Sequence, residues 1–117
     1  MCCPFELIKY GVVDWVKQKY LTNKDKSIKL ELMVYRLRHA AGARKVYELL
    51  GLNTKKIWWS RSKRFRARIN PSFLFEYLAE FRKGRYFGRL IIENKSPEAL
   101  STVKKFLQAI KNKFLGI

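Results

Sequence analysis

The sequence predicts an α+β protein with a mostly antiparallel sheet of four strands, helices on one face of the sheet and an extra helix at the C-terminus. Three observations lead to this fold class. Apolar and polar residues alternate over two stretches, which is the pattern of half-buried strands. Other stretches repeat their apolar residues every three or four positions, as amphipathic helices do. No flexible linker separates these segments, so we expect a single domain over residues 1–117.

The first residues of the chain predict a helix. Pro4 suits the first position of a helix, where its missing N–H costs nothing, and apolar residues then recur at helical spacing. These residues are Phe5, Leu7, Ile8, Gly11, Val12, Trp15 and Val16. A glycine in a helix that is apolar on two sides favours a close helix–helix contact, either within the fold or in a homodimer. Ordinary core packing explains the same pattern equally well. The residues expected at a dimer interface are Ile8, Gly11, Val12 and Trp15.

A β-hairpin and a second helix are expected next. Residues 17–21 form its first strand, and a turn-like polar run at residues 23–26 leads into the second. The second strand alternates strictly, and its apolar residues are Ile28, Leu30, Leu32 and Val34. Residues 41–50 return to helical spacing, and Gly51 ends this helix.

The most informative pattern lies in residues 55–69. One set of alternate positions is apolar and contains Ile57, Trp59, Phe65, Ala67 and Ile69. The set between them is mostly basic and contains Lys56, Trp58, Ser60, Arg64, Arg66 and Arg68. Because strand side chains alternate between the two faces of a sheet, the pattern predicts a hairpin with one apolar and one basic face, turning at residues 60–63.

Two more helices are expected toward the C-terminus. Asn70 and Pro71 have the pattern of an N-cap and a first helical residue, so we expect a helix that ends at Gly84. The apolar residues of this helix are Phe73, Leu74, Tyr77, Leu78 and Phe81. Residues 90–92 fit either a strand or a packed connection, and Ser96 begins a last helix. The apolar residues of the last helix are Leu100, Val103, Leu107, Ile110 and Phe114.

The charge of the chain restricts its partners. It has 26 Lys and Arg residues against 9 Asp and Glu residues, a net charge of +17. Such a surplus raises self-repulsion, and a polyanion offsets it, so nucleic acid is the first expected partner and an anionic membrane the second. No apolar run approaches the roughly 20 residues of a spanning helix. Glu6, Lys9 and Asp14 interrupt any signal peptide, so we expect no membrane association and a cytoplasmic, nucleoid-associated location.

Few residues suit metal or covalent chemistry. Cys2 and Cys3 are neighbours in the sequence, which rarely satisfy the geometry of a disulfide, and His39 is the single histidine. The chain lacks the motifs of serine hydrolases, of P-loop proteins and of HExxH metalloproteases. We therefore expect no cofactor and no metal site.

Several segments resemble the LAGLIDADG homing endonucleases in their single-motif form, over nearly the whole chain. Residues 11–14 resemble the centre of the motif, and residues 45–51 resemble the second helix with its closing glycine. Residues 66–70 with 73–74 resemble the passage from strand to helix after the second hairpin, and residues 104–113 the C-terminal helix. The resemblance implies the order αββαββα, a dimer formed by the motif helices, and a saddle-shaped sheet along the major groove of DNA.

One departure from the family pattern bears on catalysis. In the family, the metal-binding acid lies two positions beyond the first aspartate of the motif, and this chain has Val16 there. Valine cannot hold a divalent cation, so we expect DNA binding without cleavage and assign no catalytic residue. If the motif shifts by two residues, Asp14 becomes that acid. The alternative function is then a Mg²⁺-dependent site-specific endonuclease that acts as a homodimer.

The basic face of hairpin 55–69 is expected to bind nucleic acid, most directly duplex DNA. Arg64, Arg66 and Arg68 would repel one another along one strand unless an anion bridges them, and an exposed Trp58 beside them needs something to cover it. The expected contact residues are Lys29, Arg36, Arg38, Lys56, Trp58, Ser60, Arg61, Lys63, Arg64, Arg66 and Arg68. RNA binding is a second alternative, because aromatic residues among the basic ones can stack on unpaired bases.

Overall fold

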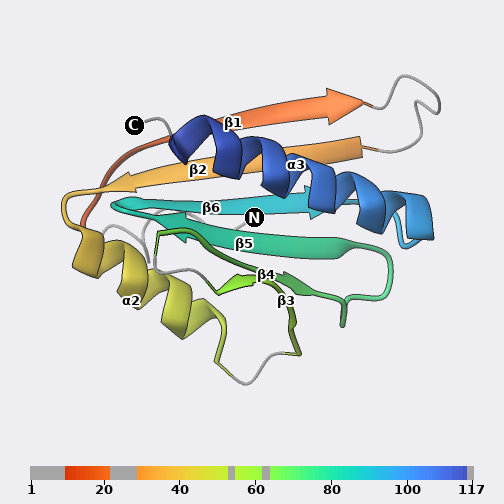
Figure 1. Cartoon of the computed structure of the whole chain (residues 1–117), viewed down its shortest axis with the longest axis horizontal. Coiled ribbons are helices and arrows are strands. Elements are labelled where there is room, and N and C mark those ends of the chain that lie inside the picture. The colour runs from red at the N-terminus through yellow and green to blue at the C-terminus, as the bar shows by residue number, and fades with distance from the viewer. Residues whose placement is uncertain (1–9, 22–28, 53–54, 62–63, 116–117) are drawn as a thin grey trace.

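The computed structural model describes residues 10–21, 29–52, 55–61 and 64–115 (Figure 1). The elements in chain order are β1 (Val12–Leu21), β2 (Lys29–Leu37), α2 (Ala40–Leu50), β3 (Ile57–Arg61), β4 (Arg66–Asn70), β5 (Tyr77–Lys83), β6 (Tyr86–Ile92) and α3 (Pro97–Leu115). The strands form a six-stranded sheet in the order β1-β2-β6-β5-β4-β3, and each neighbouring pair is antiparallel. The α+β class and the antiparallel sheet are confirmed, but the sheet has six strands where four were predicted.

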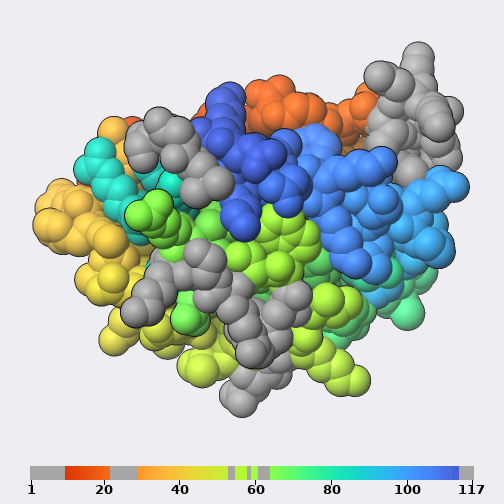
Figure 2. Space-filling model, viewed as in Figure 1, coloured from red at the N-terminus to blue at the C-terminus, as the bar shows by residue number. Residues whose placement is uncertain are grey.

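Two cores lie on the two faces of the sheet. Leu30 of β2 and Leu90 of β6 belong to a buried cluster with Val103 of α3. Tyr35 and Phe87 lie at alternate positions on the same two strands, and they belong to a second cluster with residues of α2. Because successive side chains of a strand point to opposite faces, α3 covers one face and α2 packs on the other. Figure 2 shows α3 across the face nearest the viewer, with β1 along one edge. The prediction that the helices share one face is therefore wrong.

The alternating strand, the second helix and the last helix are confirmed as β2, α2 and α3. In α2 the buried side chains are Ala43, Val46 and Tyr47, which lie on the apolar side of the predicted helix. At the start of α3, Ser96 Oγ accepts a hydrogen bond from the backbone N–H of Ala99 at 3.1 Å. This is the capping contact that the sequence pattern predicts.

The predicted N-terminal helix is corrected. Residues 1–9, which include the predicted dimer residue Ile8, lie outside the described residues. Gly11 lies in a turn with a φ of +97°, and β1 follows at once. The apolar residues of this segment fit helical spacing, but they are mainly β-branched and aromatic, which suits a strand. Pairing along β2 from Val12 to Leu21 outweighs the helical spacing.

The predicted helix that begins at Asn70 is also corrected, because residues 77–83 form β5. Asn70 Oδ1 does accept a hydrogen bond from the backbone N–H of Ser72, at 3.0 Å, but the chain then continues through a loop. The apolar residues of this segment also fit the alternation of a strand, and β5 is paired on both sides. Residues 90–92, which the sequence left open, belong to β6.

A close contact fixes the hairpin of β5 and β6. Gly88 lies opposite Phe81, and a Cβ atom at Gly88 would lie 2.0 Å from Cζ of Phe81. The fully buried Phe81 ring therefore lies directly over the glycine backbone and needs the missing side chain. Gly84 makes the turn between the two strands with a φ of +53°, a conformation that suits glycine. This turn places Lys83 and Arg85 at one end of the sheet.

Candidate nucleic-acid interface

The predicted basic face is present on β4, but it is not an open surface. Ala67 and Ile69 are fully buried in the cluster that contacts α3. Arg66 and Arg68 therefore point to the opposite face, on which α2 packs. The two-sided pattern predicted for this strand is confirmed, and the two arginines on its polar side have different surroundings.

Arg68 is held inside the protein by a carboxylate. Its side chain is 3% exposed and lies opposite Glu80 of β5. Nε and Nη2 of Arg68 donate to Glu80 Oε1 at 3.1 and 2.8 Å. The other carboxylate oxygen of Glu80 lies 3.4 Å from Nε of Arg89 on β6. Because a buried charge needs a partner of opposite sign, this pair is part of the folded structure, and the prediction of Arg68 as a DNA contact is corrected.

Helix α2 closes over the same ion pair. The guanidinium carbon of Arg68 lies 3.9 Å from the centre of the Tyr47 ring. Gly51, which follows α2, lies so close that a Cβ atom there would be 2.5 Å from Nη1 of Arg68. Burial raises the pKa of the Tyr47 hydroxyl above its ordinary value, and the positive charge of Arg68 opposes that shift. The Arg68 guanidinium is thus enclosed by a carboxylate, an aromatic ring and the backbone of a glycine.

Arg66 faces another arginine instead of a carboxylate. It lies opposite Arg82 of β5, and Arg61 of β3 lies opposite it on the other side. Arg66 and Arg82 are half-buried, and the Nε atom of each is buried without a hydrogen-bond partner among the described residues. Neither has a carboxylate at ion-pair distance in the part of the chain that the structure describes. Like charges placed directly opposite on neighbouring strands destabilise a sheet.

A third arginine joins them from α2. Burial lowers the pKa of Arg82, and the positive charges of Arg66 and Arg44 lower it further. Tyr47 and Glu48 of α2 act in the opposite direction with smaller effects. We call Arg44, Arg66 and Arg82 the arginine cluster. Within this cluster, burial and then the charges of the two neighbouring arginines disfavour the charged form of Arg82.

More cations lie at the same end of the sheet, which we call the arginine end. Strands β2, β3 and β5 end there, and β4 and β6 begin there. Besides the arginine cluster, the cations of these strand ends and turns include Arg38, Arg64, Lys83 and Arg85. All of them but Lys83 are exposed. The arginine end therefore presents several accessible cations around the cluster.

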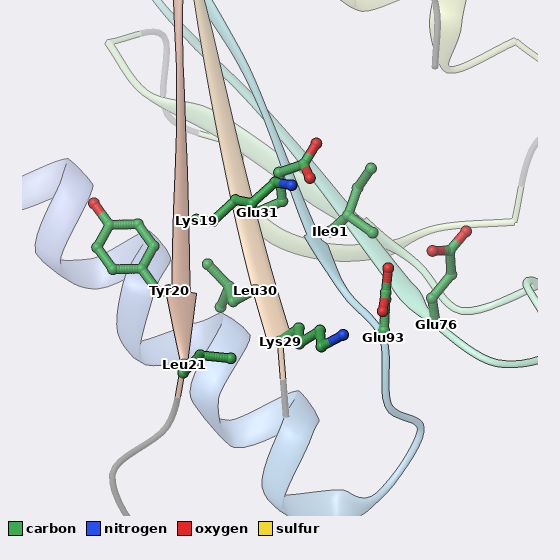
Figure 3. Close-up of a pocket in the computed structure, with 9 residues that line it drawn as sticks. All are labelled: Lys19, Tyr20, Leu21, Lys29, Leu30, Glu31, Glu76, Ile91 and Glu93. Carbon is green, nitrogen blue, oxygen red and sulfur yellow. The ribbon is translucent and has the colours of Figure 1, made fainter. Parts of the chain in front are cut away.

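Three carboxylates lie together at the opposite end of the sheet. Glu31, Glu76 and Glu93 line a groove of about 620 Å³, and two lysines, Lys19 and Lys29, line it with them (Figure 3). This end has a mixture of both charges, whereas the arginine end has an excess of one. Lys29, a predicted DNA contact, lies in this groove and not with the arginine cluster.

The remaining predicted contacts are divided among several places. Arg36 donates from Nε and Nη2 to the two carboxylate oxygens of Asp14 at 3.0 and 2.6 Å. Ser60 Oγ donates to the carbonyl of Phe65 at 2.7 Å, so it holds the β3–β4 hairpin together. Lys56 is half-buried before β3. Trp58 and Arg61 are placed only by the register of β3 against β4, and Lys63 lies outside the described residues.

Asp14, the candidate acid of the endonuclease alternative, is on strand β1 and is engaged by Arg36. Both of its oxygens accept from the Arg36 guanidinium, and its side chain is 58% exposed. Among the described residues, no group of three or more His, Cys, Asp or Glu side chains could hold a metal ion. The geometry thus gives Asp14 the role of an ion-pair partner across β1 and β2.

The other predicted dimer residues lie at the start of β1. Gly11 precedes it, and Val12 and Trp15 belong to it. Trp15 is 50% exposed, and its ring centre lies 6.4 Å from that of Tyr35. These residues therefore lie along the edge of the sheet and not on a helix.

Four cations at the arginine end were missed in the sequence, namely Arg44, Arg82, Lys83 and Arg85. A signal for three of them exists, because Arg82, Lys83 and Arg85 flank Gly84 in the pattern of a tight hairpin turn. With residues 77–83 assigned to a helix, that turn could not be recognised. For Arg44 the sequence carries no such signal, because its place beside Arg82 depends on how α2 packs on the sheet.

Comparisons with known proteins add no functional information. The chain matches no protein-family model, no curated protein and no solved structure. The resemblance to the LAGLIDADG family stays a prediction. The described elements differ from the family order at β5 and β6, and residues 12–14, which resemble the centre of the motif, belong to strand β1. No helix in the described part of the chain is long and apolar enough to cross a membrane.

Proposed function

We propose that this protein binds nucleic acid, most directly duplex DNA, and that the arginine cluster holds phosphates of the backbone. The observation that carries the proposal is the pair of half-buried arginines, Arg66 and Arg82, that face each other without a carboxylate partner in the described residues. Such a pair is costly in the free protein, and a phosphate between the guanidinium groups would offset the cost with charge-assisted hydrogen bonds.

The surroundings of the cluster support a polyanion over a small anion. Exposed cations lie at the same sheet end, and they could contact several phosphates along one backbone. The groove with Glu31, Glu76 and Glu93 is at the opposite end, where carboxylates and lysines are mixed and no comparable excess of cations is present among the described residues. The net charge of +17 would also attract nucleic acid over a distance.

The proposed mode of binding is backbone contact and not base readout by the sheet face. Helix α2 packs on the face from which the arginines project, so a duplex cannot lie flat along it. Phosphate contacts fix position and orientation without reading sequence. We therefore infer binding with modest sequence preference and without cleavage, since Asp14 is paired with Arg36. A cytoplasmic, nucleoid-associated location is part of the same proposal.

The experiment is a salt-dependent binding series on a short duplex with the wild type and the double variant Arg66→Gln, Arg82→Gln. We expect the double variant to bind at least about tenfold more weakly. The slope of log K against log salt should fall by about one for each phosphate that the variant no longer neutralises. The matched control is Lys104→Gln, Lys105→Gln, which removes the same charge from exposed positions on α3.

Two results would overturn the proposal. One is an equal loss of affinity in both double variants, because the effect would then come from net charge alone. The other is an affinity of the wild type that hardly changes with salt, because phosphate binding releases counterions. Competition by single-stranded DNA and by structured RNA in the same assay decides among the three polymers.

A further inference from the structure

Strand β1 is the exposed edge of the sheet. It pairs with β2 on one side, and no described strand lies on its other side (Figure 1). Every residue of β1 except Val12 is exposed. The exposed side chains include Val13, Trp15, Val16, Tyr20 and Leu21, with exposures between 39% and 59%. Large apolar residues are thus gathered on a strand whose outer backbone edge is open to pairing.

The geometry of β1 is regular enough to accept another strand. An irregularity between Val12 and Asp14 is followed by unbroken pairing with β2 up to Leu21, which lies opposite Lys29. Long, regular and apolar edge strands are templates for pairing with another chain. A partner strand would satisfy the open backbone groups of β1 and cover its apolar side chains at the same time.

We propose that a second copy of this chain covers β1, by antiparallel pairing of the two β1 strands about a two-fold axis at Val16. The two sheets would then form one continuous sheet. This inference concerns assembly and does not depend on nucleic-acid binding.

The axis at Val16 follows from the charges along the strand. Antiparallel pairing of two identical edges needs an axis normal to the sheet, which pairs residues whose side chains share a face. The two registers with the longest overlap have their axis at Val16 or at Lys17. An axis at Lys17 would place Lys17 opposite Lys17 of the partner subunit, and like charges directly opposite are unfavourable.

The register about Val16 is self-complementary. It places Val16 opposite Val16 of the partner subunit, and Trp15 opposite Lys17 of the partner subunit on both sides of the axis. A lysine beside an exposed tryptophan is a favourable cross-strand pair. Lys17 also lies 3.4 Å from Glu31 of its own chain, which reduces the positive charge near the axis.

The same arrangement separates the two arginine ends. β1 begins at the arginine end, where Val12 lies opposite Leu37 of β2. Antiparallel pairing of the two β1 strands would therefore place the arginine ends at opposite ends of the joined sheet. For a chain with a net charge of +17, this separation limits the repulsion between the copies.

The test uses the mass of the full chain in solution, by sedimentation over a dilution series without nucleic acid. The wild type should be a dimer, whereas Val16→Lys and Val16→Glu should each be monomers, because each places like charges opposite at the axis. An equal mixture of the two variants should form a heterodimer, because the charges at the axis are then opposite. The control is Leu74→Lys, the same kind of change at a 78% exposed position in the loop before β5, outside the proposed strand pairing, which should stay a dimer.

Each other result overturns the inference. A monomeric wild type excludes the dimer, and a dimeric Val16→Lys variant places the interface elsewhere. A mixture that stays monomeric excludes the axis at Val16. The heterodimer also shows that both variants fold, which their far-ultraviolet circular dichroism confirms separately.

Discussion

Arg66 and Arg68 leave the same strand on the same face, two positions apart, and yet they have opposite roles in the structure. Arg68 lies opposite Glu80 and is almost fully buried in an ion pair. Arg66 lies opposite Arg82, is half-buried, and has no carboxylate at ion-pair distance in the described part of the chain. The cross-strand neighbour therefore decides whether an arginine of this strand serves the fold or remains available to a ligand.

The largest effect on stability is expected at the buried ion pair of Arg68 and Glu80, which we call the inner pair. Glu80→Ala leaves Arg68 without its carboxylate in a buried site, and removes the ion-pair partner of Arg89 as well. Breaking a buried ion pair from one side costs about 3–5 kcal/mol, so the free energy of unfolding measured in urea should fall by that amount. Glu76→Ala is the matched control, a half-buried carboxylate of the groove, and should cost little.

A decrease in Glu80→Ala as small as in Glu76→Ala would contradict the assignment of Arg68 to the fold. The double variant Arg68→Met, Glu80→Leu removes both charges together. It should be clearly more stable than Glu80→Ala, because no uncompensated charge remains at this position.

The sequence predicted this strand and its alternation correctly, and it could not predict the difference between its two arginines. Alternation reports which face a side chain occupies, and Ala67 and Ile69 are buried where it places them. The partners Glu80 and Arg82 lie on β5, whose apolar residues fit helical and strand spacing alike. With that segment assigned to a helix, neither cross-strand neighbour could be recognised.

The two incorrect helices have related physical causes. The side chain of Asn70 makes the same hydrogen bond to Ser72 in a turn that it would make at the start of a helix, so the local pattern does not distinguish the two. In β1 the helical spacing was outweighed by pairing with β2. By contrast, α2 and α3 were recognised because helical spacing and end signals agree over their length.

A smaller effect of the opposite sign on stability is expected at Arg66 and Arg82, the two facing arginines that we call the outer pair. Burial and neighbouring charges lower the pKa of Arg82, which means that its charged form is less favourable in the folded than in the unfolded protein. Arg82→Gln should therefore raise the free energy of unfolding slightly, by about 0.2–1 kcal/mol, the range for cross-strand pairs. Urea unfolding measures this gain, and the binding series measures the accompanying decrease in DNA affinity. If Arg82→Gln is less stable than the wild type, the arginine cluster contributes to the fold and the contrast with Arg68 disappears.

The smallest effect on stability is expected at Tyr47, whose ring lies near one arginine of each pair, Arg68 and Arg82. Its ring centre lies 3.9 Å from the guanidinium carbon of Arg68 and 5.8 Å from that of Arg82. Burial raises the pKa of Tyr47 above its ordinary value of 10.0, so the unfolded chain releases this proton first as the pH rises. The contribution of the buried neutral hydroxyl is present below pH 10.0 and is lost as the pH rises toward the folded-state pKa.

Tyr47→Phe keeps the ring over Arg68 and removes the titrating group. The free energy of unfolding of the wild type should therefore fall more steeply than that of the variant above pH 10.0. Urea unfolding at a series of pH values measures the difference. Parallel pH profiles would mean that Tyr47 ionises as easily in the folded protein as in the unfolded chain. Helix α2 would then not shield the ion pair of Arg68 and Glu80 from water. The burial of Arg68, which Arg66 lacks, would have to come from the neighbouring strands alone.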